Sequence, residues 1–167
     1  MNAGFLAAAR YDTVILEGCD GTGKSTFARQ LAGEHGFTLV HSPPTPDTVS
    51  LVDRYTELLG KPGRLVLDRC FISELVYGPL HRGRSRITWP EALELVGSAV
   101  TRKGVLVHLT ASPAVIRDRL LRRDGTAPPL SELEDLIAAY QTVFNSLSTY
   151  TEVITIRPEP DNRRSTG

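Results

Sequence analysis

The amino-acid sequence predicts a single α/β domain in which a five-stranded parallel sheet is covered by helices on both faces. Three observations predict this class. Short apolar runs alternate with helical patterns, and the runs lack the alternation of polar and apolar residues that marks a strand with one wet face. The length of 167 residues suits one domain. Hydrophobic residues make up 41% of the chain and charged residues 23%, which excludes a disordered or fibrous protein.

In the first half of the chain, strand and helix patterns alternate three times. The strand patterns are short and rich in aliphatic residues, and they cover residues 13–17, 37–40 and 64–67. A helical spacing of apolar residues follows each of them, over residues 25–32, 47–59 and 71–77. Right-handed crossovers of this kind place successive strands in parallel. The prolines of residues 42–46 exclude regular pairing, so a loop follows the second strand.

The second half supplies the remaining strands and the ends of the chain. Apolar runs at residues 105–109 and 153–156 predict the fourth and fifth strands. Residues 81–86 hold four basic or titratable side chains and a glycine, which predicts a loop. We expect residues 1–10 and 158–167 to be frayed, as the ends of most domains are.

Three further helices have start signals. Thr88 is a predicted N-cap with a proline in the first turn, and Ser112 has the same arrangement. Ser131 with Glu134 has the spacing of a capping box. These signals predict helices over residues 89–100, 113–124 and 131–147.

Charge and cysteine content limit the partners. Lys plus Arg and Asp plus Glu both number 19, so no overall field draws the chain to a polyanion, and we expect no stable nucleic-acid partner. No apolar run approaches the length of a membrane span, which predicts a cytoplasmic protein without a membrane partner, in the host cytoplasm if a phage encodes it. Cys19 and Cys70 lack the number and spacing of disulfide or zinc frameworks, so we expect each to pack as a small residue.

Residues 18–25 match the phosphate-binding pattern G-x-x-x-x-G-K-S/T, between a strand pattern and a helix pattern. Glycines let consecutive backbone N–H groups curve around phosphate oxygens, and the start of the helix adds its positive dipole end. Lys24 would reach the β- and γ-phosphates of a nucleotide, and the Ser25 hydroxyl would bind Mg²⁺. A glycine-rich turn without a ligand is the alternative. The predicted ATP phosphate-binding residues are Gly18, Asp20, Gly21, Thr22, Gly23, Lys24, Ser25 and Thr26.

Asp68 and Arg69 follow the third predicted strand. The carboxyl ends of parallel strands face the ligand crevice, so an acid and a guanidinium at this place point to a phosphate site. Asp68 could hold Mg²⁺ or its waters, and Arg69 could grip a second phosphate with a bidentate fork. An internal ion pair is the alternative.

Two arginine-rich segments could close over a transferring phosphoryl group. Arg117, Arg119, Arg122 and Arg123 lie on one predicted helix, and phosphoryl transfer spreads negative charge that such side chains stabilise. The cluster at residues 81–86 could contact the phosphate of an acceptor. For both segments, a solvated basic face is the alternative.

Motifs along most of the chain occur together in one known family. Residues 16–26 read Leu-Glu-Gly-Cys-Asp-Gly-Thr-Gly-Lys-Ser-Thr, and an Asp-Arg pair is followed by Ser73. Pro113 precedes Arg119 and Arg123 on a predicted helix, and Tyr140 lies on the next. Together these segments resemble thymidylate kinases and related nucleoside monophosphate kinases. The segment Ser-Glu-Leu-Val-Tyr-Gly at residues 73–78 resembles the corresponding segment of small deoxynucleoside monophosphate kinases of bacteriophages.

The resemblance implies a three-layer P-loop kinase fold with a small arginine-bearing lid at about residues 117–130. The implied reaction moves the γ-phosphoryl group of Mg-ATP onto a deoxynucleoside monophosphate, so ATP, Mg²⁺ and a nucleotide are the implied partners. Relatives often dimerise, which adds a homodimer. The implied catalytic residues are Lys24, Asp68, Arg69, Arg119 and Arg123, with Ser25 and Asp68 at the metal. The implied acceptor-binding residues are Glu17, Asp20, Arg69, Ser73, Tyr77 and Tyr140.

Two departures from the family pattern leave the base preference open. Residues 42–44 read Ser-Pro-Pro where thymidylate kinases commonly show Arg-Glu-Pro, and residues 76–78 lack the glutamine that often reads thymine. A site without that amide could accept several bases, because strong discrimination needs polar groups that the wrong base leaves unpaired. Two other classes of function remain alternatives: a P-loop kinase of a nucleoside, small metabolite or modified DNA base, and a regulatory ATPase without a phosphoryl acceptor.

Overall fold

The computed structural model describes residues 3–42 and 44–158, and the expected fraying of residues 1–2 and 159–167 lies outside them. Five strands form one sheet in the order β2-β3-β1-β4-β5, and every neighbouring pair is parallel. This confirms the predicted five-stranded parallel sheet. The strands are β1 (Thr13–Glu17), β2 (Thr38–His41), β3 (Leu65–Asp68), β4 (Gly104–Leu109) and β5 (Val153–Ile156).

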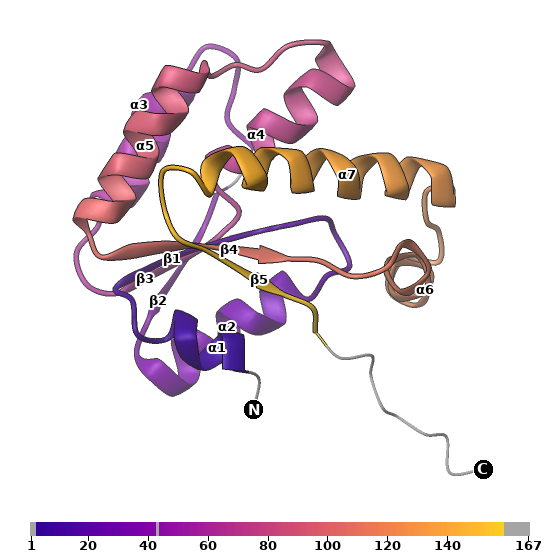
Figure 1. Cartoon of the computed structure of the whole chain (residues 1–167), viewed down its shortest axis with the longest axis horizontal. Helices are drawn as coiled ribbons and strands as arrows, with labels where there is room; N and C mark the ends of the chain where they lie inside the picture. Colours follow the sequence, from indigo (N-terminus) through magenta and orange to yellow (C-terminus); the bar gives the residue numbers. More distant parts are fainter. Residues whose placement is uncertain (1–2, 43, 159–167) are drawn as a thin grey trace.

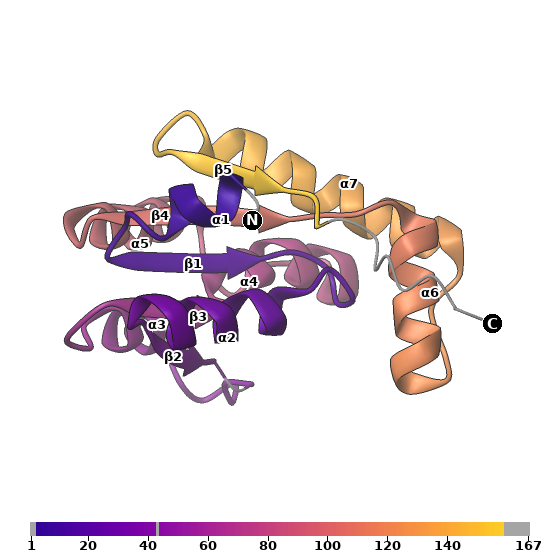
Figure 2. The same ribbon diagram turned by 90° about the horizontal axis from the view of Figure 1, so that it is seen from below.

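Helices cover both faces of the sheet, as predicted (Figure 1). On one face lie α1 (Ala3–Ala8) and α2 (Lys24–His35). The other face carries α3 (Leu51–Leu59), α4 (Phe71–Tyr77), α5 (Trp89–Thr101) and α7 (Leu130–Leu147). A π-helical turn, η1 (Gly78–Arg82), continues α4, and α6 (Pro113–Asp124) stands beside the end of the sheet (Figure 2).

Two apolar cores result because successive side chains of a strand point to opposite faces. Val14 and Leu16 of β1 pack against α1 and α2, whereas Ile15 packs with the helices of the other face. All three side chains are fully buried. Each strand is therefore apolar on both faces, which explains the continuous apolar runs in the sequence.

The N-terminal segment is a packed helix, so the expectation that residues 3–10 are frayed is wrong. Phe5 is buried and packs edge to face on Phe27 of α2, with ring centroids 5.1 Å apart. Ala8 is also fully buried. Both side chains belong to the apolar core that β1 and α2 share on this face of the sheet.

Three of the differences from the predicted boundaries involve caps or turns. Helix α3 starts at Leu51, because Ser50 caps it by accepting a hydrogen bond from the Asp53 N–H at 3.3 Å. Helix α7 starts at Leu130 directly after Pro129, so Ser131 lies inside the helix and forms no cap. His81 and Arg82 belong to η1, and the loop is shorter than residues 81–86.

The parallel sheet brings the carboxyl ends of its strands to one edge. Figure 2 shows β1, β4 and β5 pointing towards the side where α6 lies. The register pairs Leu16 with Asp68 and Glu17 with His108, so the loops after β1, β3 and β4 leave the sheet together. Among the described residues, no helix is both long and apolar enough to cross a lipid bilayer.

Candidate active site

The loop between β1 and α2 has the backbone that its glycines predict. Gly18 has φ 152°, and a Cβ there would lie 2.1 Å from the carbonyl oxygen of Leu109, so only glycine fits against β4. Gly23 has φ 93° and is the N-cap of α2. The loop therefore ends at a helix N-terminus, where N–H groups without helical partners can bind an anion.

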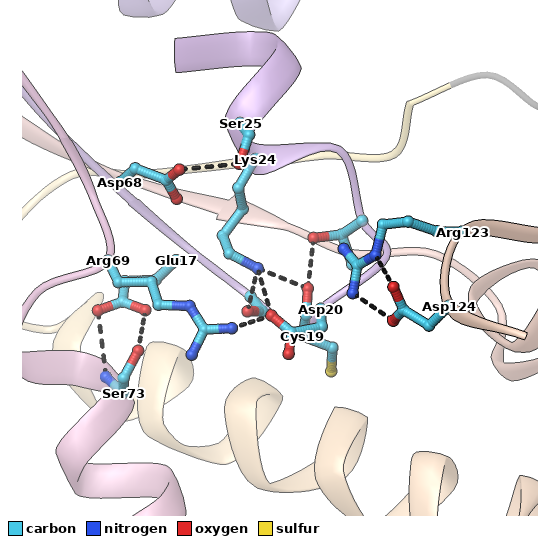
Figure 3. Close-up of polar contacts among 12 residues, drawn as sticks. Glu17, Cys19, Asp20, Lys24, Ser25, Asp68, Arg69, Ser73, Arg123 and Asp124 are labelled. Carbon is cyan, nitrogen blue, oxygen red and sulfur yellow. Dashed lines mark hydrogen bonds and ion pairs between the residues drawn. The ribbon is translucent and has the colours of Figure 1, made fainter. Parts of the chain in front are cut away.

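Lys24 lies inside this loop (Figure 3). Its Nζ donates hydrogen bonds to the carbonyl oxygens of Gly18 at 2.8 Å and Cys19 at 2.7 Å. The side chain is only 6% exposed, and burial lowers the pKa of Lys24, although the negative charges of Glu17 and Asp68 oppose this shift. The ammonium group is thus held in place by the backbone before any phosphate arrives.

Ser25 and Asp68 meet next to the lysine. The Ser25 hydroxyl donates to Oδ2 of Asp68 at 3.0 Å, from the first turn of α2 to the end of β3 (Figure 3). Hydroxyl and carboxylate oxygens are hard ligands of the kind that Mg²⁺ prefers. The described residues contain no group of three or more His, Cys, Asp or Glu side chains that could hold a metal by themselves. This donor set fits Mg²⁺, which binds through one or two protein oxygens together with phosphates and water.

Arg69 forms an ion pair with Asp20, and not with the adjacent Asp68 (Figure 3). Arg69 has φ 71°, an uncommon conformation for a residue other than glycine, and it turns the chain between β3 and α4. The guanidinium is about one third exposed. Two charged groups that were predicted to bind phosphate or acceptor thus face each other across the site.

The buried side chain of Glu17 holds the turn after Arg69 in place through hydrogen bonds. Its carboxylate accepts hydrogen bonds from the Cys70 N–H at 2.6 Å, the Ser73 N–H at 3.1 Å and the Ser73 hydroxyl at 2.5 Å. It therefore caps the start of α4 and anchors the residues that follow Arg69. Complete burial raises the pKa of Glu17 to about 7, although the hydrogen bonds from Ser73 and Cys70 and the charge of Lys24 lower it.

Tyr140 of α7 lies next to this cap. Its hydroxyl is 3.4 Å from the Ser73 hydroxyl, and its ring packs edge to face on Tyr77. Burial raises the pKa of Tyr140. Glu17 and Tyr140 have no exposed surface, so the structure brings these predicted acceptor residues together behind the wall of the site. Their direct contact with an acceptor stays a prediction.

A pocket of about 530 Å³ opens in front of the loop, and we call it the loop pocket. Its walls contain most of the predicted phosphate and catalytic residues. The lining residues are Asp20, Gly21, Gly23, Lys24, Ser25, Thr26, Arg29, His41, Asp68, Arg69, Arg119 and Arg123. Gly18 and Thr22 do not line it, because they support the loop from within; the Thr22 hydroxyl donates to the Cys19 carbonyl at 2.7 Å.

A second pocket, of about 690 Å³, lies between α4, η1, α6 and α7, and we call it the lid pocket. Tyr77 and His81 both line it, and their rings stack on each other with centroids 5.4 Å apart and planes 9° apart. The two pockets share Asp20 and Arg123, so they are adjoining parts of one cleft. Cys19 lines the lid pocket and Cys70 is buried, and both are free thiols that pack as predicted, with pKa values that burial raises.

The predicted lid arginines divide into two pairs. Arg119 donates to the Gly21 carbonyl at 3.2 Å, and Arg123 lines both pockets while its guanidinium holds Asp124 through two hydrogen bonds of 2.8 Å. Arg117 and Arg122 are exposed and line neither pocket. Both have the exposed position that the alternative of a solvated basic face requires.

Two arginines of the cluster at residues 81–86 bind neighbouring segments of the chain. Arg86 donates to the carbonyl oxygens of Thr45, Pro46 and Val49, which holds the loop after β2. Arg82 forms an ion pair with Glu74. Of the four predicted side chains in this cluster, His81 lines the lid pocket, whereas the three arginines line neither pocket of the cleft.

Several lining residues were not predicted. Arg29 lies one turn after Ser25 on α2, and this spacing of four residues was a visible signal. His41 ends β2 and pairs in register with Asp68, so its place at the carboxyl end of a strand was a signal too. Glu132 and Asp135 of α7 line the lid pocket, and no local pattern marked them as site residues.

Comparisons with known proteins support the fold. No family model matches the chain. The chain is 26% identical over 141 residues to YorR, an uncharacterized prophage-derived protein of Bacillus subtilis strain 168, which covers 83% of this chain and 85% of YorR. The crystal structure of YorR in complex with phosphorylated GDP matches with a TM-score of 0.73 at 21% identity, over 86% of this chain and 84% of that one.

Two kinases of different acceptors have the same fold. Deoxyadenosine kinase from M. mycoides with bound dCTP matches with a TM-score of 0.59 at 11% identity, over 86% of this chain and 89% of the kinase. Shikimate kinase from Acinetobacter baumannii in complex with shikimate matches with a TM-score of 0.54 at 17% identity, over 93% and 88%. The chain therefore has the α/β fold of P-loop kinases, whereas its resemblance to thymidylate kinases stays a prediction.

Proposed function

We propose that the protein is a kinase that transfers the γ-phosphoryl group of Mg-ATP to a deoxynucleoside monophosphate. One observation carries this proposal: the loop pocket and the lid pocket meet at Asp20 and Arg123. A nucleotide triphosphate on the loop and an acceptor in the lid pocket would bring their phosphates together there. The volume of about 690 Å³ is in the range of small-molecule sites.

Cations surround the place where the two pockets meet. Lys24, Arg69, Arg119 and Arg123 all line the loop pocket, and Arg123 lines the lid pocket as well. Phosphoryl transfer needs positioning and charge stabilisation more than covalent chemistry from the protein, so preorganised cations supply what the reaction requires. Lys24 is already held at its place by two backbone carbonyls, and Arg69 would exchange Asp20 for an acceptor phosphate.

Ser25 and Asp68 would hold Mg²⁺ through the Ser25 hydroxyl and a carboxylate oxygen of Asp68. When bound, Mg²⁺ neutralises the negative charge of the phosphates of ATP. Arg119 and Arg123 reach the same pocket from α6, and closure of the lid over both substrates would keep ATP from water.

The acceptor in this proposal is a phosphate and not a hydroxyl. A phosphate oxygen is already a nucleophile at neutral pH, so no general base is essential, whereas a sugar hydroxyl must lose a proton during transfer. Asp20 is a carboxylate where the two pockets meet, and Arg69 neutralises it. Cations outnumber carboxylates in the loop pocket, which favours an acceptor that brings a phosphate to the place where the pockets meet.

The comparisons support a nucleotide as partner. YorR was crystallised with phosphorylated GDP, and the deoxyadenosine kinase with dCTP. Such substrates occur in the cytoplasm, which is the location this proposal requires. A homodimer stays a prediction that sedimentation velocity would test.

The proposal is tested by an assay of ADP release with Mg-ATP against each deoxynucleoside and ribonucleoside monophosphate, with the products identified by chromatography. We expect a diphosphate product from at least one deoxynucleoside monophosphate. Release of ADP without phosphorylation of any deoxynucleoside monophosphate would reject the proposal. ATP hydrolysis that no acceptor stimulates would favour a regulatory ATPase instead.

A kinase with a hydroxyl acceptor, such as a nucleoside or a small metabolite, is the second candidate. The observation that favours it is Asp20, because a carboxylate at the reaction centre could take the proton of a hydroxyl if Arg69 released it. The same assay with deoxynucleosides separates the two candidates, since only this one predicts a monophosphate product.

A further inference from the structure

Two carboxylates of the lid pocket have no partner in the part of the chain that the structure describes. Glu132 and Asp135 lie one turn apart near the start of α7 and line this pocket. Across residues 3–42 and 44–158, neither side chain forms an ion pair or a hydrogen bond. The other acids of the pocket differ, because Asp20 is held by Arg69 and Asp124 by Arg123. Both residues are exposed at the edge of the pocket, so their carboxylates are open to a ligand that brings hydrogen-bond donors.

The rest of the pocket suits a flat ring. Tyr77 and His81 line it, and their rings stack on each other with planes 9° apart. The aliphatic side chains of Leu120, Leu133 and Leu136 add apolar surface. Aromatic and aliphatic walls of this kind bind planar apolar faces, whereas a few polar groups at the edge select among them.

The charged residues distinguish the two ends of the lid pocket. Asp20 and Arg123 also line the loop pocket, so they mark the end where phosphates meet. Glu132 and Asp135 line the lid pocket but not the loop pocket. A nucleotide with its phosphate at Arg123 would therefore present the edge of its base to the carboxylates of α7.

We infer that the lid pocket selects a base that carries hydrogen-bond donors on its edge, and guanine before the others; this inference rests on the proposed function. Guanine carries an N1–H beside its 2-amino group, so one carboxylate can accept from both. Adenine and cytosine each carry one amino group. Thymine has a single N–H between two carbonyl oxygens, which repel a carboxylate. The expected order of acceptors is dGMP, then dAMP and dCMP, then dTMP.

The first test compares kcat/KM for dGMP, dIMP and dTMP with Mg-ATP. Inosine lacks only the 2-amino group of guanine, so dIMP isolates that donor. We expect dGMP to exceed dTMP by about tenfold or more, with dIMP between them, because a site built for hydrogen bonds rejects analogues that lack them. A higher kcat/KM for dTMP than for dGMP would overturn the inference and leave the kinase proposal intact.

The second test replaces the carboxylates. Glu132→Gln and Asp135→Asn keep the shape of each side chain and remove its charge, and Glu134→Gln is a matched control on the same helix that is exposed and does not line the pocket. We expect at least one of the two pocket variants to lower kcat/KM for dGMP by about tenfold while dTMP changes less than about twofold. Equal losses for both nucleotides would overturn the inference.

Binding measured by calorimetry separates the two proposals. If no nucleoside monophosphate is phosphorylated but dGMP binds more tightly than dTMP and loses this advantage in the variants, the proposed function fails and the base selection stands. Binding of neither dGMP nor dTMP would overturn both.

Discussion

The backbone of the phosphate loop holds Lys24 in place, whereas a neighbouring acid on the surface holds Arg123 of the lid. Lys24 donates to two carbonyl oxygens and is 6% exposed, while Arg123 pairs with Asp124 and is 59% exposed. An ion pair in water contributes little to order, because solvent screens it and both side chains keep competing conformations. Lys24 is therefore set before a substrate binds, whereas we expect Arg123 to be ordered only when a substrate binds.

The strongest test of this comparison removes the cation of the loop. Lys24→Ala should lower kcat by about 10³-fold, since a preorganised donor at the transferring phosphate is lost. The measurement is steady-state turnover with the best acceptor, with circular dichroism to confirm that the variant is folded. Lys61→Ala, on the exposed turn after α3, is the control and should keep its turnover. Retention of most activity in Lys24→Ala would show that the loop does not carry the reaction.

The buried carboxyl group of Glu17, which caps α4, predicts that the stability of the protein depends on pH. The pKa of Glu17 is raised from 4.5 to about 7 by burial, so the folded state binds its proton more tightly than the unfolded state does. The stabilisation that this group contributes is complete below pH 4.5 and is lost as the pH rises to about 7. The difference amounts to about 3 kcal/mol.

Urea unfolding of the wild type and Glu17→Gln at several pH values checks this prediction. The glutamine can still accept from the Cys70 and Ser73 N–H groups, but it does not titrate. The fall in stability between pH 4.5 and 7 should therefore be smaller in the variant. The same slope in both proteins would show that Glu17 keeps an ordinary pKa and that the cap is less enclosed than the structure indicates.

The sequence predicted the residues on the loop side of the cleft more completely than those on the lid side. The phosphate loop is a continuous stretch whose glycines and lysine act within a few residues of one another, so a local motif contains its geometry. The cap of α4 joins Glu17 to residues more than fifty positions away, and only the folded chain shows that this carboxylate is buried. The same holds for Arg69, whose neighbour in sequence is Asp68 but whose partner is Asp20.

Helix boundaries show the same limit. Ser131 with Glu134 had the spacing of a capping box, but α7 starts at Leu130 with Pro129 as its N-cap, so Ser131 already lies inside the helix. The charge pattern alone did not separate the four arginines of α6. The family resemblance singled out Arg119 and Arg123, and these two line the loop pocket. A helix turns by about 100° per residue, so which arginines face the site depends on how α6 is placed.

Arg69 lies between the two regions and should have an intermediate effect. Arg69→Lys keeps the charge but loses the bidentate fork, so we expect the KM of the acceptor to rise by about tenfold or more while the KM of ATP changes little. Initial rates with each substrate varied in turn measure both constants. Arg10→Lys, at an exposed position after α1, serves as the control. A matching rise in the KM of ATP would place Arg69 on the donor and not on the acceptor.

The smallest effect is expected in the lid, where two arginines one residue apart form a matched pair. Arg123 lines both pockets, whereas Arg122 pairs with Asp118 at 2.8 Å and lines neither. Arg123→Ala should lower kcat several-fold, up to about tenfold, because its guanidinium must first leave Asp124 and thus contributes less than a preorganised cation. Arg122→Ala should leave kcat within about twofold, as expected for a surface ion pair. A loss in Arg123→Ala as large as that in Lys24→Ala would mean that the lid is as preorganised as the loop, and the two sides of the cleft would then differ in exposure but not in their contribution to the rate.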